Sequence, residues 1–269
     1  MRSTEGISGM SEFEFREAAD MVILAADAWL ARDLQEFSDI EVEVPLENGK
    51  VILDIVATMR GTIAPFTDYK GRKVIIDWKT TGGPVDGESF RRRYIRSWQW
   101  RKYASAVPEA SLFIYRGLSR SLDIRSRGES NIPANRTREL SPLVIHNGVS
   151  QEVSQRWNGI LGMRNSLVNI GTPWPQNTDS CDDFGEPCPF YNECLGNYQK
   201  LTIPELSDTM SYSKAELFLR CPERYRLTLL SEQIEDPTEQ EYCSTTFGSC
   251  VHVGLAALWM EAFEKRENL

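Results

Sequence analysis

Apolar positions along the chain repeat with helical spacing in some segments and with strand-like spacing in others. Residues 11–37 carry an apolar side chain at every third or fourth position, which is typical of a helix packed on a core. The predicted core-facing stripe of this helix is Phe15, Ala18, Ala19, Val22, Ile23, Ala26 and Trp29. Strand-like segments follow at 40–44 and 51–56, and the Asn48-Gly49 pair between them favours a hairpin turn.

The rest of the chain continues this mixture of spacings. Strands are predicted at 74–80 and 111–116, and helices are predicted at 88–105, 151–169, 211–230 and 248–269. Strands interspersed with helices predict an α/β protein with a mixed central sheet flanked by helices. A chain of 269 residues is long enough to bury a sizeable core.

Charged side chains interrupt two of the predicted strands. Asp77 and Lys79 follow three apolar residues and point to the same face of the strand, because side chains alternate along it. Asp54 lies in the middle of another apolar run, where an unpaired charge is costly. A divalent metal and a phosphate would compensate these charges, the acids holding the cation and the lysine meeting the anion. For Asp77 and Lys79 the alternative is an ion pair at a strand end.

The predicted helix at 88–105 carries two further sets of polar side chains. Gln99 and Tyr103 are four residues apart and share a face, so they can orient a substrate or the lysine, unless they reflect simple amphipathicity. A local basic stripe comprises Arg91, Arg92, Arg93 and Arg96. The net charge of -9 argues against generic electrostatic coating of nucleic acid but leaves room for such a stripe.

The cysteines are expected to be metal ligands or free thiols rather than disulfides, because no signal-peptide pattern directs export. Cys181, Cys188 and Cys194 lie within one short segment, and Cys221 is the best candidate for a fourth ligand. Four thiolates suit zinc or an iron–sulfur cluster, and spacing alone does not decide between them. Unrelated thiols are the remaining alternative. No apolar run approaches the roughly 20 residues of a membrane span, so a cytoplasmic location without membrane contact is expected, in a bacterial cell or a phage-infected host.

Together these motifs resemble the PD-(D/E)xK nuclease superfamily, in the branch that holds the RecB and AddB nuclease domains, CRISPR-adaptation exonucleases and phage exonucleases. The resemblance rests on Asp54, Asp77-Trp78-Lys79 and the Gln99-x-x-x-Tyr103 pair that follows the lysine on a helix. The cysteine segment 181–194 is similar to the C-terminal cysteine triplet of that branch. Residues 211–225 resemble its opening helix with the first cluster cysteine, and Gly248-x-x-x-His252 resembles its first metal-site motif.

The resemblance implies a restriction-endonuclease-like fold and metal-dependent DNA cleavage, exonucleolytic on single-stranded ends, in recombination, repair or phage DNA processing. A Mg²⁺ or Mn²⁺ ion would be bound by the side chains of Asp54, Asp77 and His252 and by the backbone carbonyl of Trp78. Lys79 would position or deprotonate the attacking water, and Gln99 and Tyr103 would hold the strand or the lysine. The expected cluster is 4Fe–4S, the arginine stripe would contact DNA, and a helicase or recombination protein is a possible partner.

The order of the motifs departs from that of the family, because the opening helix and the histidine motif come last. Either a circular permutation or a fragment of a tandem array explains this order. We expect one permuted domain over 1–269, with the catalytic core and cysteine triplet at 11–195, a bridge at 196–210 and the displaced helices at 211–269. Two other functions are open: a noncatalytic nuclease-like module that binds DNA or acts as a scaffold, and a zinc-binding interaction protein.

Overall fold

The computed structural model describes the chain in segments that together form two compact units. The described residues are 10–46, 51–60, 69–82, 85, 88–120, 136–170, 174–178, 181, 188–191, 194, 206, 210–234 and 239–267. The first unit comprises Met1–Ser150 and Gln240–Leu269, and the second comprises Gln151–Glu239. The first unit therefore unites both ends of the sequence. The expectation of one permuted domain stays a prediction, and most of the predicted bridge at 196–210 lies outside the described residues.

In the described residues, the first unit is an α/β structure with a mixed sheet of six strands, which confirms the predicted mixed sheet flanked by helices. Its strands are β1 (Phe37–Leu46), β2 (Val51–Met59), β3 (Lys73–Thr81), β4 (Ala110–Ser119), β5 (Thr137–Glu139) and β6 (Leu143–Val144). Their order is β1-β2-β3-β4-β5, and β6 also pairs with β4. The β3–β4 pair is parallel and the other pairs are antiparallel.

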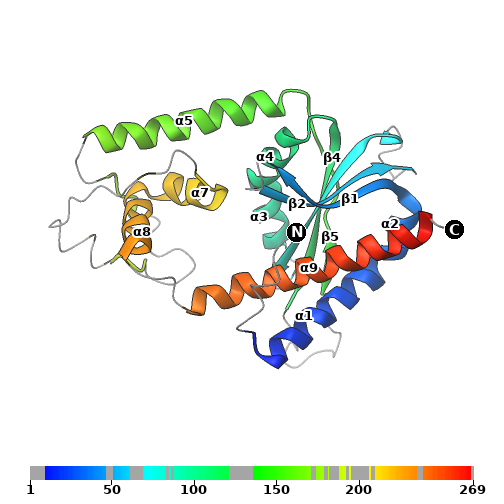
Figure 1. Ribbon diagram of the computed structural model, residues 1–269. Helices are drawn as coiled ribbons and strands as arrows, with labels where there is room; N and C mark the ends of the chain where they lie inside the picture. The colour runs from blue at the N-terminus through cyan, green and yellow to red at the C-terminus, as the bar shows by residue number, and fades with distance from the viewer. Residues whose placement is uncertain are drawn as a thin grey trace. The chain divides into compact units, whose positions relative to one another are not determined.

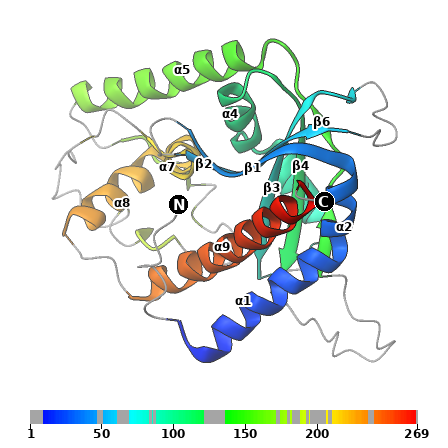
Figure 2. The same cartoon turned by 45° about the vertical axis from the view of Figure 1, so that its right-hand side comes forward.

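Helices cover both faces of this sheet (Figure 1, Figure 2). On one face lie α1 (Glu12–Ala25), the π-helical turn η2 (Ala26–Leu30), α2 (Ala31–Glu36) and the long C-terminal helix α9 (Glu239–Glu267). On the other face, α3 (Glu88–Arg96) and α4 (Gln99–Ala106) set their aromatic side chains against Phe113 and Tyr115 of β4. In the order of the sheet, β3 is the middle strand.

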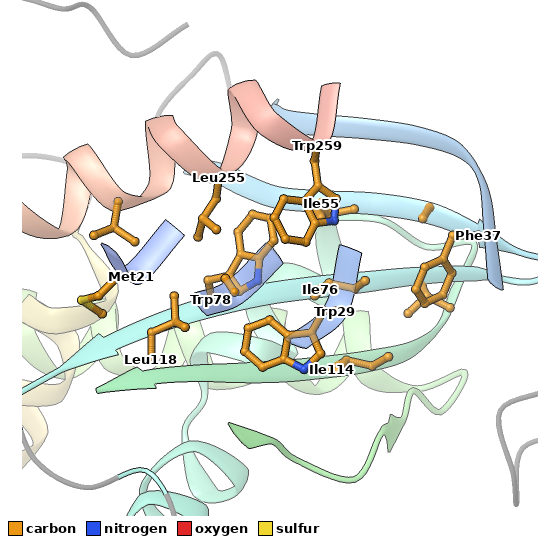
Figure 3. Close-up of a cluster of buried hydrophobic side chains, with 14 of the residues drawn as sticks. Met21, Trp29, Phe37, Ile55, Ile76, Trp78, Ile114, Leu118, Leu255 and Trp259 are labelled. Atoms are coloured by element: carbon orange, nitrogen blue, oxygen red, sulfur yellow. The ribbon is translucent and has the colours of Figure 1, made fainter. Parts of the chain in front are cut away.

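The main core lies between the sheet and the layer formed by α1, η2 and α9 (Figure 3). Alternate residues of β3 enter it, so Ile76 and Trp78 point into this core while Asp77 points to the opposite face. The ring of Trp78 meets that of Trp259 from α9 edge-on, with centroids 5.2 Å apart. The middle strand therefore has one apolar face and one face that carries the charged residues.

The predicted helix at 11–37 is confirmed, but its buried stripe differs from the predicted one. Ser11 caps its start, because its hydroxyl accepts the Glu14 N–H while the Glu14 carboxylate accepts the Ser11 N–H. Phe15 and Ile23 are 55% and 58% exposed, and Ala19 is also exposed. Ala18 and Trp29 of the predicted stripe are buried, and Val22 and Ala26 pack partly buried against the core, but Met21 and Ala25 of the neighbouring row are buried as well. Both rows are apolar, so spacing alone did not select between them.

The predicted single helix at 88–105 is wrong, because it is two helices interrupted at residues 97 and 98. The hydroxyl of Ser97 accepts the backbone N–H of Gln99 at 3.1 Å, and the N–H of Ser97 closes back onto the carbonyl of Tyr94 at 3.2 Å. A side chain that captures a nearby backbone donor competes with the helical ladder. The interruption turns α3 and α4 into separate elements.

The second unit contains α5, whose helix Val149–Ile170 begins at the end of the first unit, together with α7 (Tyr212–Arg220) and α8 (Pro222–Ile234). Its core is built from Ile160, Trp174, Met210, Ala215, Phe218, Tyr225 and Leu229. The rings of Trp174 and Tyr225 stack with centroids 6.0 Å apart. Across the described parts of both units, no helix combines the length and the apolar character that a bilayer crossing requires.

Candidate active site

The pairing of β2 with β3 sets the two acids of the candidate site beside each other. The antiparallel ladder ends at Ile55 and Ile76, and the next residues outward are Asp54 and Asp77. Residues at opposite positions of an antiparallel pair share a face. Beyond that point the carboxylate of Asp54 accepts the backbone N–H of Trp78 at 2.7 Å. Both acids are nearly inaccessible, with 5% and 3% exposure.

Lys79 forms an ion pair with Asp77, since its ammonium lies 2.8 Å from Oδ2. Burial raises the pKa of Asp77 to about 6, and the charge of Asp54 adds to this shift although Lys79 opposes it. Burial acts to lower the pKa of Lys79, but the charges of Asp77, Tyr103 and Asp54 raise it above its ordinary value. Lys79 is therefore a firmly protonated cation beside an acid that ionises reluctantly.

His252 reaches Asp54 from the C-terminal helix α9. Its Nδ1 lies 2.8 Å from Oδ1 of Asp54, across 198 residues of sequence. The neighbouring Val251 and Leu255 are fully buried in the main core, and this anchors the turn of α9 that carries the imidazole. Burial would raise the pKa of Asp54, but the charge and hydrogen bond of His252 hold it below its usual value.

Gln99 and Tyr103 lie together on α4, as their spacing predicted. The side-chain amide of Gln99 donates to the hydroxyl of Tyr103 at 2.7 Å. Burial raises the pKa of Tyr103, and the charge of Asp77 adds to the shift, so the phenol lies within the field of the acids. The Tyr103 ring packs on Phe113 of β4, with centroids 6.3 Å apart. The structure therefore brings all six predicted polar side chains, Asp54, Asp77, Lys79, Gln99, Tyr103 and His252, to one region of the first unit.

A buried ion network on the face of the sheet covered by η2, α2 and α9 was missed by sequence reasoning. Arg116 of β4 is fully buried and donates to both carboxylate oxygens of Asp33 at 2.6 Å and to Glu139 at 2.8 Å. Trp259, which packs on Trp78, donates its indole N–H to Asp33 at 2.9 Å. The available signal was an arginine inside the apolar run of β4, where a charge requires a partner.

The predicted arginine stripe lies on α3. The side chains of Arg91, Arg92, Arg93 and Arg96 are exposed. Arg91 and Arg92 each lie 3.3 Å from the carboxylate of Glu88, so part of their charge is compensated within the helix. The guanidinium of Arg93 lies over the Tyr94 ring at 5.6 Å. The stripe thus offers basic groups to solvent directly before the helix that carries Gln99 and Tyr103.

The four predicted cluster cysteines all lie in the second unit. Cys181, Cys188, Cys194 and Cys221 are free thiols. Burial raises the pKa of Cys194 to about 11, and the charges of Glu223 and of the other three cysteines add to this shift, so these groups lie within electrostatic range of Cys194. The backbone N–H of Arg224 lies 3.4 Å from the sulfur of Cys221.

The donor groups of the two candidate sites have the chemistry of metal ligands. Within the described residues, no three His, Cys, Asp or Glu side chains are grouped so that they hold a metal ion as they stand. At the acids, Lys79 and His252 supply the compensating contacts. The donors nevertheless suit a divalent cation, because Nδ1 of His252 and Oδ1 of Asp54 are 2.8 Å apart. Adjacent ligands of a cation bound at about 2.1 Å lie about 3 Å apart. Four neighbouring thiols likewise have the chemistry of an iron–sulfur or zinc site.

Comparisons with known proteins leave the functional conclusion to this geometry. No protein-family model matches the chain, and no curated protein is significantly similar to it.

Proposed function

We propose that the protein is a metal-dependent phosphodiester hydrolase that cleaves DNA. The observation that carries this proposal is the convergence of the Asp54–His252 pair with the Asp77–Lys79 pair, from three separate segments of the chain. Two buried carboxylates, an imidazole and an ammonium combine ligands for a cation with a group that attracts a phosphate. The mixed sheet supports a restriction-endonuclease-like fold, which we include in the proposal.

Different residues of the site would bind the metal ion, act on the attacking water and contact the substrate strand. Asp54, Asp77 and His252 would hold Mg²⁺ or Mn²⁺, with the Trp78 carbonyl as a further ligand. The bound cation would supply polarisation of the scissile phosphate and acidification of a water molecule. Lys79, whose ammonium lies 2.8 Å from Oδ2 of Asp77, would position or deprotonate the attacking water and stabilise the developing charge. Gln99 orients the hydroxyl of Tyr103 through their hydrogen bond. This hydroxyl would then hydrogen-bond to the substrate strand.

DNA is the proposed substrate because the chain combines an acidic overall charge with an exposed basic helix. The net charge is -9, but Arg91, Arg92, Arg93 and Arg96 concentrate exposed positive charge on α3, the helix directly before α4. Arginines of this kind bind phosphates and position the strand. We propose an exonuclease that acts on single-stranded ends.

We also propose that the cysteines of the second unit bind a 4Fe–4S cluster, with zinc as the alternative. The proximity of Cys194 to Cys181, Cys188 and Cys221 supports this assignment. The cluster would stabilise the fold. Anaerobically purified protein is expected to be brown, with Cys221→Ser reducing iron content, whereas colourless protein that contains zinc would favour the alternative.

The deciding experiment compares cleavage of labelled single- and double-stranded DNA in Mg²⁺ and in Mn²⁺. Asp77→Asn and Lys79→Ala are expected to abolish cleavage while circular dichroism shows a folded protein. Lys73→Ala is the matched control, because Lys73 lies on the same strand and forms ion pairs with Glu41 and Glu109 outside the site. It is expected to retain activity.

Each outcome separates the functions. Cleavage that survives both Asp77→Asn and Lys79→Ala would refute the assigned site. DNA binding without cleavage under either metal would identify the noncatalytic nuclease-like module instead.

A further inference from the structure

Trp98 occupies the interruption between the arginine-bearing helix α3 and the site helix α4. The hydroxyl of Ser97 captures the N–H of Gln99, and Trp98 becomes the residue that caps α4, with φ -75° and ψ -14°. Its side chain is only half-buried. A tryptophan set between a basic helix and a candidate active site is well placed to meet the substrate.

The neighbouring Trp100 shows what a purely structural tryptophan looks like at this place. Trp100 is 5% exposed, donates its indole N–H to the carbonyl of Ile95 at 3.1 Å and packs on Phe113. It fastens α4 to the sheet and to the end of α3. Trp98 lies two residues earlier and stays partly accessible to solvent. The contact between α4 and the sheet is already made by Trp100.

Arg101 holds the indole of Trp98 in place. Its guanidinium lies over the Trp98 ring at 5.0 Å from the centroid and over the Trp100 ring at 4.4 Å. Contact between a guanidinium and an aromatic face is attractive and restricts both groups. The indole is thus ordered before any ligand arrives, which lowers the entropic cost of binding.

The position of Trp98 relates it directly to the proposed reaction. The side-chain amide of the next residue, Gln99, donates to the Tyr103 hydroxyl at 2.7 Å. The charges of Asp77 and Lys79 both act on the pKa of Tyr103, so its hydroxyl lies within electrostatic range of the site. On the other side, Arg96 is the last residue of α3. The basic side chains of α3, Trp98 and the Gln99–Tyr103 pair therefore follow one another within residues 91–103.

We propose that Trp98, held by Arg101, stacks on an unpaired nucleobase next to the scissile phosphodiester and thereby selects single-stranded DNA. This inference rests on the proposed nuclease function. Proteins that bind single strands combine a basic path for the backbone with aromatic rings on which bases stack. A base inside a duplex has both faces covered by its neighbours, so the platform discriminates against double-stranded ends.

The test measures binding of two fluorescent strands of equal length and charge, in EDTA so that neither is cleaved. One strand is oligothymidylate of about 15 nucleotides, and the other carries abasic residues throughout. The wild-type protein is expected to bind the thymidylate strand about 5- to 100-fold more tightly. Trp98→Ala is expected to remove this preference by weakening thymidylate binding alone, with an unchanged salt dependence because the phosphate contacts remain.

Two further variants complete the experiment. Trp98→Phe keeps an aromatic face and should retain most of the preference. Phe13→Ala removes an aromatic side chain that is 73% exposed on α1, on the other face of the sheet, and should behave like wild type. If Trp98→Ala does not fold, Trp98→Leu preserves apolar packing without an aromatic face and is expected to lose the preference in the same way.

The outcomes for this inference and for the nuclease function are distinct. Active wild-type protein whose thymidylate preference persists in Trp98→Ala or Trp98→Leu would overturn the stacking role and leave the nuclease intact. Faster wild-type cleavage of blunt duplex than of single strands would also overturn it. Wild-type protein that neither binds nor cleaves DNA would instead refute the proposed function.

Discussion

Nδ1 of His252 lies 2.8 Å from Oδ1 of Asp54, although 198 residues separate them in the chain. The contact joins the C-terminal helix α9 to the second strand of the sheet, so the candidate site exists only when both ends of the first unit have come together. The imidazole is the contribution of α9 to the set of six side chains described above. The role of His252 can therefore be tested by a substitution in α9 that leaves the residues of β2 and β3 unchanged.

Replacing His252 by alanine is expected to weaken Mn²⁺ binding by about 10-fold or more and to reduce the activity with Mn²⁺ relative to Mg²⁺, because imidazole is a softer ligand than water. Isothermal titration with each metal measures the first effect, and cleavage rates measure the second. The control is His146→Ala, which removes the other of the two histidines of the chain. An unaltered ratio of Mn²⁺ to Mg²⁺ activity in His252→Ala would exclude the imidazole as a ligand.

Metal binding should depend on pH through Asp77. Burial and the charge of Asp54 raise the pKa of Asp77 to about 6, so this carboxyl carries a proton below that pH and must release it to hold a cation. The affinity for Mn²⁺ is expected to fall about tenfold for each pH unit below 6 and to level off above it. Titrations between pH 5 and pH 8 measure this slope. Asp77→Asn should bind weakly with a shallower slope, and a steep slope that persists in this variant would assign the proton to another group.

The buried network around Arg116 should contribute strongly to stability. Asp33→Ala leaves a fully buried guanidinium without its bidentate partner, and it removes the acceptor of the Trp259 indole N–H. The free energy of unfolding is expected to fall by about 3–5 kcal/mol, as measured by urea denaturation. The double variant Asp33→Leu with Arg116→Met should recover most of this loss, because an apolar pair needs no compensation.

Glu12→Ala is the control for this network. It breaks an ion pair with Arg16 in which both side chains are at least 75% exposed, and it should change stability little. An equally small effect of Asp33→Ala would show that the buried pair is dispensable.

Gly117 permits the close approach of α3 to β4. It lies opposite Lys79 in the parallel pair, and a Cβ at this position would fall 2.3 Å from the ring of Phe90. Gly117→Ala is therefore expected to cost about 1–3 kcal/mol of stability through overpacking. Adding Phe90→Leu, which shortens the obstructing side chain, should restore part of it.

Gly159→Ala provides the matched glycine control for this clash. Gly159 lies within α5, and a Cβ there meets nothing within 4 Å. This variant should gain about 0.5–1 kcal/mol because alanine loses less conformational freedom than glycine in a helix. Urea denaturation of both glycine variants decides the point, and similar effects at the two positions would contradict a specific clash.

The strands and their charged residues could be predicted because a carboxylate inside an apolar run is a local and costly anomaly. Asp54 and Asp77 stand out in this way, and the structure places them side by side at the end of one ladder. The break at Ser97 could not be predicted, since Ser97 could equally have faced solvent within a continuous helix. The exposure of Phe15 and Ile23 depends on which of two apolar rows meets the sheet, and only the packing of the whole unit decides it.

The pairing of Arg116 with Asp33 shows a further limit of sequence reasoning. The arginine was visible as an anomaly within an apolar strand, but its partner lies 83 residues earlier, on a helix with several other acids. Nothing in local spacing selects Asp33 among them. Long-range partners of this kind depend on how the strands and helices are arranged in space. The sequence pattern predicted only a mixed sheet flanked by helices and not that arrangement.

The helix α9 gives the first unit an unusual order of assembly. It covers Trp78 with Trp259 and brings His252 to Asp54, yet it is the last element of this unit to be synthesised. Until α9 has been synthesised, only α1, η2 and α2 of the described elements cover the apolar face of the sheet, and Asp54 lacks its contact with His252. Docking of this one late helix then closes the core over Trp78 and, in the same step, brings His252 to Asp54.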